Sequence, residues 1–180
     1  MCGDNGYQLD GFNVCGDVYI PFNEDGFDNI IEHKTNYRVK CKKLKHHLEI
    51  IRNLIKINSK NVRDYIIKNF ENISEITDYN VEDMILTRTH TLKDKYTEQY
   101  KHLDKYYVVK TDRNYCKGQI IVNNKPDCEC VLQHAFTVHS IQGETADNNL
   151  FIEIEKMNDE KALYTAISRA RRWEQIKIII

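Results

Sequence analysis

The stretch that decides the fold is AFTVHSIQGET, residues 135–145. Residues 135–138 suit a buried strand, and they run directly into a polar turn that contains one glycine. In an open parallel sheet, ligands bind just beyond the carboxyl ends of the strands. The polar side chains of this turn are therefore candidates for a binding site, although an ordinary strand-to-helix connection with capping residues would show a similar pattern.

The polar residues of the turn divide into two groups by their chemistry. The first group offers hydroxyl and imidazole groups that can hydrogen-bond phosphate oxygens, and its members are Thr137, His139 and Ser140. The second group can reach a second ligand at a point where glycine lets the backbone approach closely, and its members are Gln142, Gly143 and Glu144. The turn therefore offers two kinds of contact.

A second informative stretch is YTAISRAR, residues 164–171. Its apolar positions share one helical face, at Leu163, Ala166, Ile167 and Ala170. We therefore expect Arg169 to project from a different side, where an arginine can lie across a domain interface. The planar guanidinium suits the charge that develops on a transferring γ-phosphoryl group, the role called an arginine finger. The alternative is a surface arginine paired with a carboxylate.

Together the two stretches resemble a known family. Residues 137–145 resemble motif V of superfamily 1 helicases, and residues 164–171 resemble their motif VI, in the family's order. Residues 36–38, NYR, resemble motif IV, and residues 85–88, ILTR, resemble the short strand that follows it. Gly3-Asp4 with Gln8-Leu9 resembles motif III, except that three residues separate the pairs where the family has two. The resemblance is to the second RecA-like motor domain of the DNA-directed, UvrD-like branch, including helicases of large DNA viruses.

The resemblance implies roles for the matching residues. Arg38 and Arg169 would be catalytic, because they would stabilise charge on the γ-phosphoryl group. The implied ATP contacts are Asp4, Gln8, Arg38, Gln142, Gly143, Glu144 and Arg169. The implied nucleic-acid contacts are Thr137, His139 and Ser140. The resemblance also implies ATP with Mg²⁺ as cofactor, single-stranded DNA as a partner, and an N-terminal RecA-like helicase domain as a second partner.

The sequence contains no phosphate loop of the form G-x-x-x-x-G-K-[ST], and no apolar strand that ends in paired acids precedes Gly3. In the family, both features belong to the first motor domain. We therefore expect the chain to hydrolyse no ATP alone and to couple hydrolysis to translocation only when joined to a first domain. The alternatives are a non-catalytic nucleic-acid-binding or interaction module, whose working surface would be the basic residues 38–56, and a fragmentary gene product.

The alternation of strand and helix predicts the α/β class, with a parallel sheet flanked by helices, and the resemblance implies that this sheet is RecA-like. Helices are predicted over residues 38–56 and 62–70, near residue 91 and from about residue 159. Strands are predicted at residues 84–87, 135–138, 150–154 and 177–180. Residues 72–79 are predicted to be a polar connection. A small antiparallel β insertion is expected at about residues 106–133. Residues 1–33 would be a loop-rich remnant of the first motor domain, and residues 34–180 the second domain.

Composition narrows the class of protein further. The 180 residues are 41% hydrophobic and 29% charged, which is typical of a globular domain. The N-terminus lacks the residue order of a secretory signal, so we expect an intracellular, reducing compartment. No apolar stretch reaches the roughly 18 residues of a membrane span, so no membrane partner is expected. The six cysteines lack regular spacing, and Cys128-x-Cys130 is only half of a typical zinc site, so we expect no metal. The charged residues among residues 38–56 are all basic except Glu49, which suits either phosphate contact or a solvated helix face.

Overall fold

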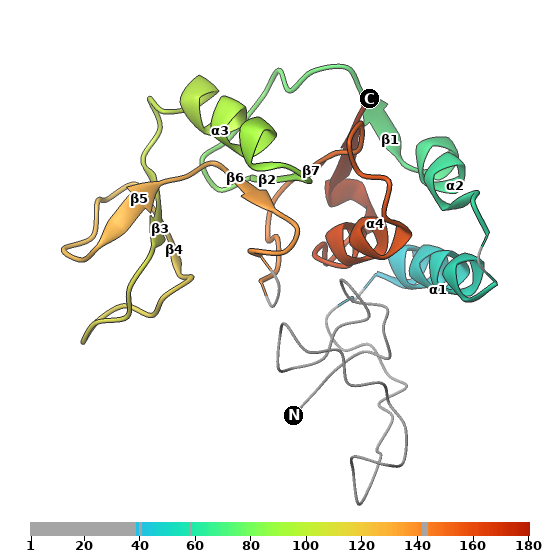
Figure 1. Cartoon of the computed structure of the whole chain (residues 1–180), viewed down its shortest axis with the longest axis horizontal. Helices are drawn as coiled ribbons and strands as arrows, with labels where there is room; N and C mark the ends of the chain where they lie inside the picture. Colours follow the sequence, from blue (N-terminus) through green and yellow to red (C-terminus); the bar gives the residue numbers. More distant parts are fainter. Residues whose placement is uncertain (1–38, 40, 58, 142–143) are drawn as a thin grey trace, which may run out of the picture.

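The structure is a computed structural model that describes residues 39, 41–57, 59–141 and 144–180 (Figure 1). The predictions for residues 1–33 and for Asp4, Gln8, Arg38, Gln142 and Gly143 lie outside the described residues.

A five-stranded sheet forms the centre of the molecule, and every neighbouring pair of strands in it is parallel. The strand order is β1-β8-β7-β2-β6. The strands span Glu71–Ile73 (β1), Met84–Thr87 (β2), Ala135–Thr137 (β6), Leu150–Glu153 (β7) and Ile176–Ile179 (β8). The expected α/β class with a parallel sheet is therefore confirmed.

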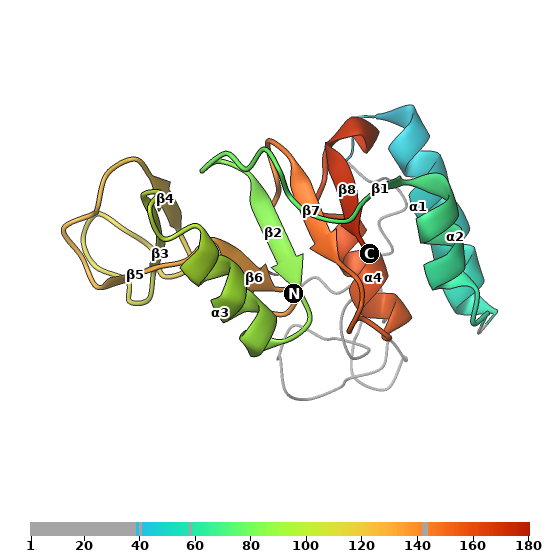
Figure 2. The same cartoon turned by 90° about the horizontal axis from the view of Figure 1, so that it is seen from above.

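Helices cover both faces of this sheet, as Figures 1 and 2 show. One face packs under α1 (Lys42–Lys56), α2 (Val62–Asn69) and α4 (Glu160–Ile167), and the other packs under α3 (His90–Gln99). Successive residues of β2 divide between the two sides: Leu86 packs in the larger core and Ile85 in the smaller one. Strand residues alternate between faces, so a sheet buried on both sides requires the uninterrupted apolar run seen in β2.

The helix α1 forms because its apolar residues recur at helical spacing. The predicted stripe is the buried face: Leu44, Leu48, Ile51 and Ile55. The strand β1 was not predicted, because residues 72–79 read as a polar connection. Its residues are exposed or half-buried, and they are held by pairing with β8 rather than by a buried apolar face. An edge strand of this kind leaves little hydrophobic pattern in the sequence.

A separate three-stranded antiparallel sheet confirms the predicted insertion. Its order is β4-β3-β5, with strands at Lys105–Val108 (β3), Ile120–Val122 (β4) and Cys130–Leu132 (β5). Gly118 and Asn123 lie just outside these strands, with φ values of 96° and 68°. Both values lie in the left-handed region that glycine and asparagine tolerate best. The insertion lies beyond the β6 edge of the large sheet (Figure 2).

A buried polar cluster joins the insertion to the large sheet. His134, which is fully buried, lies with one ring nitrogen, Nε2, 3.0 Å from the carbonyl oxygen of Leu103 and the other, Nδ1, 3.2 Å from the Tyr79 hydroxyl. The neutral ring satisfies both contacts, by donating at Nε2 and accepting at Nδ1. Burial, against the opposing effect of the Leu103 hydrogen bond, lowers the pKa of His134 from 6.5 to about 4.

This lowered pKa predicts acid sensitivity. His134 binds a proton below about pH 6.5 in the unfolded chain, but only below about pH 4 in the folded chain. The free energy of unfolding therefore decreases as the pH falls from 6.5 to 4. At pH 5 the loss amounts to about 2 kcal/mol. Urea unfolding at pH 7.5 and pH 5 should show this loss in the parent and a smaller one in His134→Gln. The exposed His90→Gln variant should behave as the parent does, and equal pH dependence in all three proteins would contradict the assignment.

Candidate nucleotide and nucleic-acid sites at two edges of the sheet

The loop at residues 138–149 connects the carboxyl end of β6 to the amino end of β7. Because the two strands are parallel members of one sheet, this loop passes from one edge of the sheet to the other. A four-residue strand such as β2 separates these edges by about 10 Å. The expectation that all polar residues of the turn lie beyond the carboxyl ends of the strands is therefore wrong. Only the first residues of the loop lie at the carboxyl ends of the strands, where ligands of parallel sheets bind. The last residues of the loop lie at the amino edge.

At the carboxyl edge, Thr137 builds the turn and does not face solvent. Its side chain is buried, and its hydroxyl donates to Ser140 Oγ at 3.1 Å and accepts from the Ser140 backbone nitrogen at 3.3 Å. His139 and Ser140 are exposed. The structure thus brings the three predicted nucleic-acid contacts together, with Thr137 supporting the two residues that are accessible.

A fourth residue at this edge, Arg88, was not predicted as a contact. It follows β2 directly, and its guanidinium NH1 lies 2.9 Å from Nδ1 of His139, across the boundary between β2 and β6. The helix α3 begins two residues later, with Thr89 as its N-cap. A helix N-terminus carries partial positive charge, so Arg88 and the start of α3 place positive charge close to His139. The sequence signal was a basic residue directly after a fully buried strand.

At the amino edge, Arg169 joins the two predicted motifs. Its guanidinium donates to the Glu144 carbonyl oxygen at 3.3 Å, to the Thr165 carbonyl oxygen at 3.1 Å and to Ser168 Oγ at 3.0 Å. The backbone repeats the link, because Ala146 N donates to Arg169 O at 2.9 Å. Residues 144–146 and 169 therefore form one unit at the amino ends of β7 and β8.

The environment of Arg169 differs from the expectation in two ways. The helix α4 ends at Ile167, so Arg169 follows the helix instead of projecting from one of its sides. The side chain is 2% exposed, so it is not a surface arginine. Apolar periodicity through Ala170 predicted a longer helix, but Ala170 is buried in a backbone bridge to Ala146.

Gln175 secures the same unit and was not predicted. Its amide nitrogen donates to the carbonyl oxygens of Asp147 and Asn148, at 2.9 Å for the latter, and its amide oxygen accepts from the backbone nitrogens of Arg171 and Arg172. One side chain thus ties the returning loop to the short 3₁₀ helix η3 (Trp173–Gln175). Its bonds to Arg171 and Arg172 are local, but no local pattern signals the link to the loop, because Asp147 and Asn148 lie about 28 residues away.

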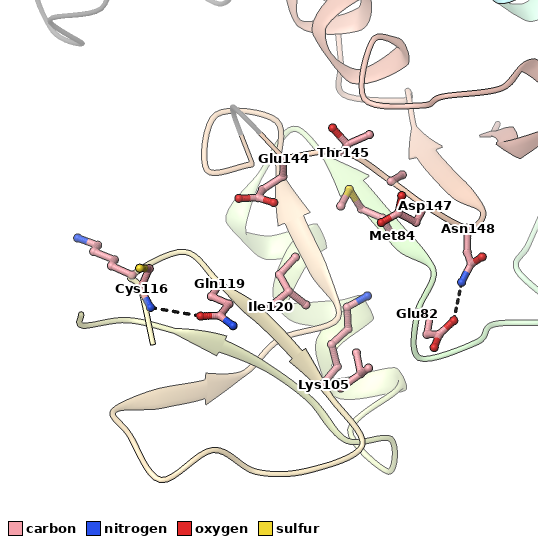
Figure 3. Close-up of a pocket in the computed structure, with 13 residues that line it drawn as sticks. Glu82, Met84, Lys105, Cys116, Gln119, Ile120, Glu144, Thr145, Asp147 and Asn148 are labelled. Atoms are coloured by element: carbon pink, nitrogen blue, oxygen red, sulfur yellow. Dashed lines mark hydrogen bonds between the residues drawn. The ribbon is translucent and has the colours of Figure 1, made fainter. Parts of the chain in front are cut away.

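A pocket opens beside this unit, between the insertion and the returning loop (Figure 3). Its lining includes Glu144, Asp147, Glu82 and Lys105. Asn148 donates to Glu82 at 2.7 Å across the amino ends of β2 and β7. Lys105 is buried and donates to the Asp83 carbonyl oxygen, and burial lowers the pKa of its ammonium group to about 8, against the opposing carboxylates of Asp83 and Glu82. The pocket therefore presents mixed charge and no single binding chemistry.

Metal and membrane sites were also sought among the residues that the structure describes. No group of three or more His, Cys, Asp and Glu side chains there could hold a metal ion. Cys41, Cys116, Cys128 and Cys130 are free thiols. No described helix is both long and apolar enough to cross a bilayer.

Comparison with known proteins places the fold. No protein-family model matches the sequence, and no curated protein matches it. Among solved structures, Pif1 helicase from Candida albicans superposes with a TM-score of 0.60 at 10% identity, over 81% of this chain and 55% of that chain. Bacteroides sp Pif1 in complex with ADP-AlF4 superposes with a TM-score of 0.51 at 15% identity, over 79% of this chain and 50% of that chain. Unliganded Pif1 from Bacteroides sp superposes with a TM-score of 0.52 at 14% identity, over 81% of this chain and 51% of that chain.

The chain therefore spans about half the length of the helicases that it matches. At these identities the likeness concerns the fold: a RecA-like α/β sheet flanked by helices, of the kind found in Pif1 helicases.

Proposed function

We propose that this chain is the second motor domain of a superfamily 1 DNA helicase, which couples ATP hydrolysis to movement along single-stranded DNA together with a first motor domain. The observation that carries the proposal is the hydrogen-bonded unit of Arg169 and Glu144. It joins the stretches that resemble motifs V and VI, on a RecA-like sheet. Two motifs that are 25 residues apart in sequence meet at one edge, as a shared site requires.

In this proposal the amino edge faces the nucleotide. Arg169 would stabilise charge on the γ-phosphoryl group, and Glu144 would position the loop that senses the nucleotide. The residues present suit only part of an ATP site, since the sequence has no phosphate loop and the described residues offer no carboxylate cluster for Mg²⁺. The first motor domain would supply both. This chain would contribute further ATP contacts from Asp4, Gln8, Arg38, Gln142 and Gly143.

The carboxyl edge would hold the DNA. Arg88, His139 and Ser140 are accessible or partly accessible there, and each can contact a phosphate oxygen. Thr137 would act through the turn that it stabilises. The two ligands would then lie at opposite edges of one sheet, linked by residues 138–149.

Single-stranded DNA binding tests this assignment. Arg88→Ala should weaken binding of a labelled oligonucleotide by about fivefold near 0.1 M salt, because one phosphate contact contributes about 0.7 to the salt slope. Fluorescence anisotropy over a salt series measures both quantities. Lys101→Ala is the matched control, since it removes one positive charge beyond the C-terminal end of α3 and should change little. Equal losses in both variants would place the DNA elsewhere on the domain.

A further inference from the structure

The helices α1 and α2 form a hairpin that is far more basic than the rest of the chain. Residues 41–69 contain eight Lys and Arg and two Asp and Glu, a formal charge of +6. The whole chain carries −1, so the remaining residues carry −7. This contrast between one helical hairpin and the rest of the protein plays no part in the sites at the sheet edges.

The packing of α1 fixes where its charges point. Its apolar stripe is buried against α4 and the sheet, which leaves Lys42, Lys45 and Lys56 exposed on the outer side. The helix has 15 residues, so this outer face is about 22 Å long. Figure 2 shows α1 and α2 at the side of the molecule away from the insertion and α3.

The lysines in the first turn of α1 oppose the dipole of the helix. Its first turn holds Lys42, Lys43 and Lys45 and no acid, and its N-cap, Cys41, makes no side-chain capping bond. Cations at this end oppose the helix dipole and cost about 0.3–1 kcal/mol each. Within the described part of the chain, no carboxylate forms an ion pair with any of these three lysines. An external anion would offset this cost.

The short helix η3 packs against the basic face of α1. Trp173 stacks on His47 with ring centroids 4.4 Å apart, and Lys43 Nζ lies 4.0 Å from the Trp173 ring centroid. These contacts hold η3 against α1 and fix the position of Lys43 at the amino end of the helix.

We propose that the outer face of α1 is a docking surface for the phosphate backbone of duplex DNA. Binding to single strands generally adds aromatic side chains on which bases stack. The exposed residues of α1 and α2 include no Phe, Tyr or Trp. A surface with charge and no stacking platform suits the duplex, whose phosphates supply one charge per about 1.7 Å of axis. The surface is sequence-independent, and it is separate from the carboxyl edge.

The test compares two triple variants of the 180-residue protein that lose the same charge. The first is Lys42→Gln with Lys43→Gln and Lys45→Gln, and the control is Lys95→Gln with Lys101→Gln and Lys156→Gln, all exposed lysines outside the hairpin. Anisotropy with a labelled duplex should show that the first variant binds at least about tenfold more weakly near 0.1 M salt. Its salt slope should fall by about 2 to 3, because each lost phosphate contact removes about 0.9. The control variant should bind as the parent does.

Several outcomes would overturn the proposal: equal losses in the two triple variants, a larger loss with a single strand than with the duplex, or unchanged duplex binding accompanied by lost binding to acidic lipid vesicles. The double variant Lys42→Gln with Lys45→Gln leaves the Lys43 contact with Trp173 intact, so it separates lost charge from disturbed packing. Circular dichroism confirms the fold of each variant. Because Arg88→Ala is measured with single strands, its failure would count against the proposed function and leave the duplex result standing.

Discussion

Replacing Arg169 by alanine, in a protein that joins this chain to a first motor domain, is expected to lower the rate of ATP turnover by about 10³-fold or more. The physical reason is that charge on the γ-phosphoryl oxygens develops in the transition state. Loss of the Arg169 guanidinium therefore lowers kcat much more than it weakens ATP binding. Steady-state hydrolysis with DNA present gives kcat and KM separately. The chain without a first domain should show no turnover.

Arg169 is buried and hydrogen-bonded, so this experiment must separate chemistry from folding. Arg169→Lys keeps the charge and part of the packing, and thermal unfolding reports the folded fraction of each variant. The control is Arg171→Ala, whose exposed ion pair with Asp147 contributes little. If turnover per folded molecule stays near the parent value in Arg169→Ala, the finger assignment is wrong and Arg169 only holds the loop of Glu144.

The second large effect concerns stability. Gln175→Ala should lower the free energy of unfolding by about 3 kcal/mol, because it removes four hydrogen bonds to partly buried backbone groups, each worth about 0.5–1.5 kcal/mol. In a chain of this size, the melting temperature should fall by about 6–12 °C. Thermal denaturation followed by circular dichroism measures this shift.

Gln119→Ala provides the matched control for Gln175, since Gln119 is exposed and its side chain accepts a hydrogen bond from Cys116 N. Its loss should cost less than about 1 kcal/mol. Gln175→Glu is a sharper variant. It keeps an oxygen for Arg171 and Arg172 but sets a second oxygen against the carbonyls of Asp147 and Asn148, so it should be at least as damaging as alanine at pH 7. A stable Gln175→Glu protein would show that the donated bonds matter little.

The sequence predicted those parts of the fold that depend on periodic burial. The stripe of α1, the buried run of β2 and the turns of the insertion all follow from local patterns, and each is confirmed. The strand β1 and the end of α4 depend on partners that are distant in sequence. Glu71 pairs with Lys177, and Ala170 pairs with Ala146, so no local window contains the cause.

The candidate sites show the same division. Thr137, His139 and Ser140 do lie together, because a strand end followed by a polar turn specifies its own geometry. Arg88 and Gln175 were missed because their partners come from other strands and loops. Only the helicase resemblance suggested that Arg169 and Glu144 lie close together. Their separation of 25 residues in the sequence does not show at which edge of the sheet the loop ends.

The position of β8 in the sheet bears on the order of assembly. The strand lies between β1 and β7, and among the described residues β1 pairs with β8 alone, so β1 joins the sheet only after β8 has been inserted. The register Glu71↔Lys177 closes a segment of more than 100 residues. Pairings of such long range carry a large entropy of loop closure and slow the folding reaction. During synthesis, β1 therefore leaves the ribosome long before β8. It can pair with β8 only after residues 176–179 have been translated and released from the ribosome.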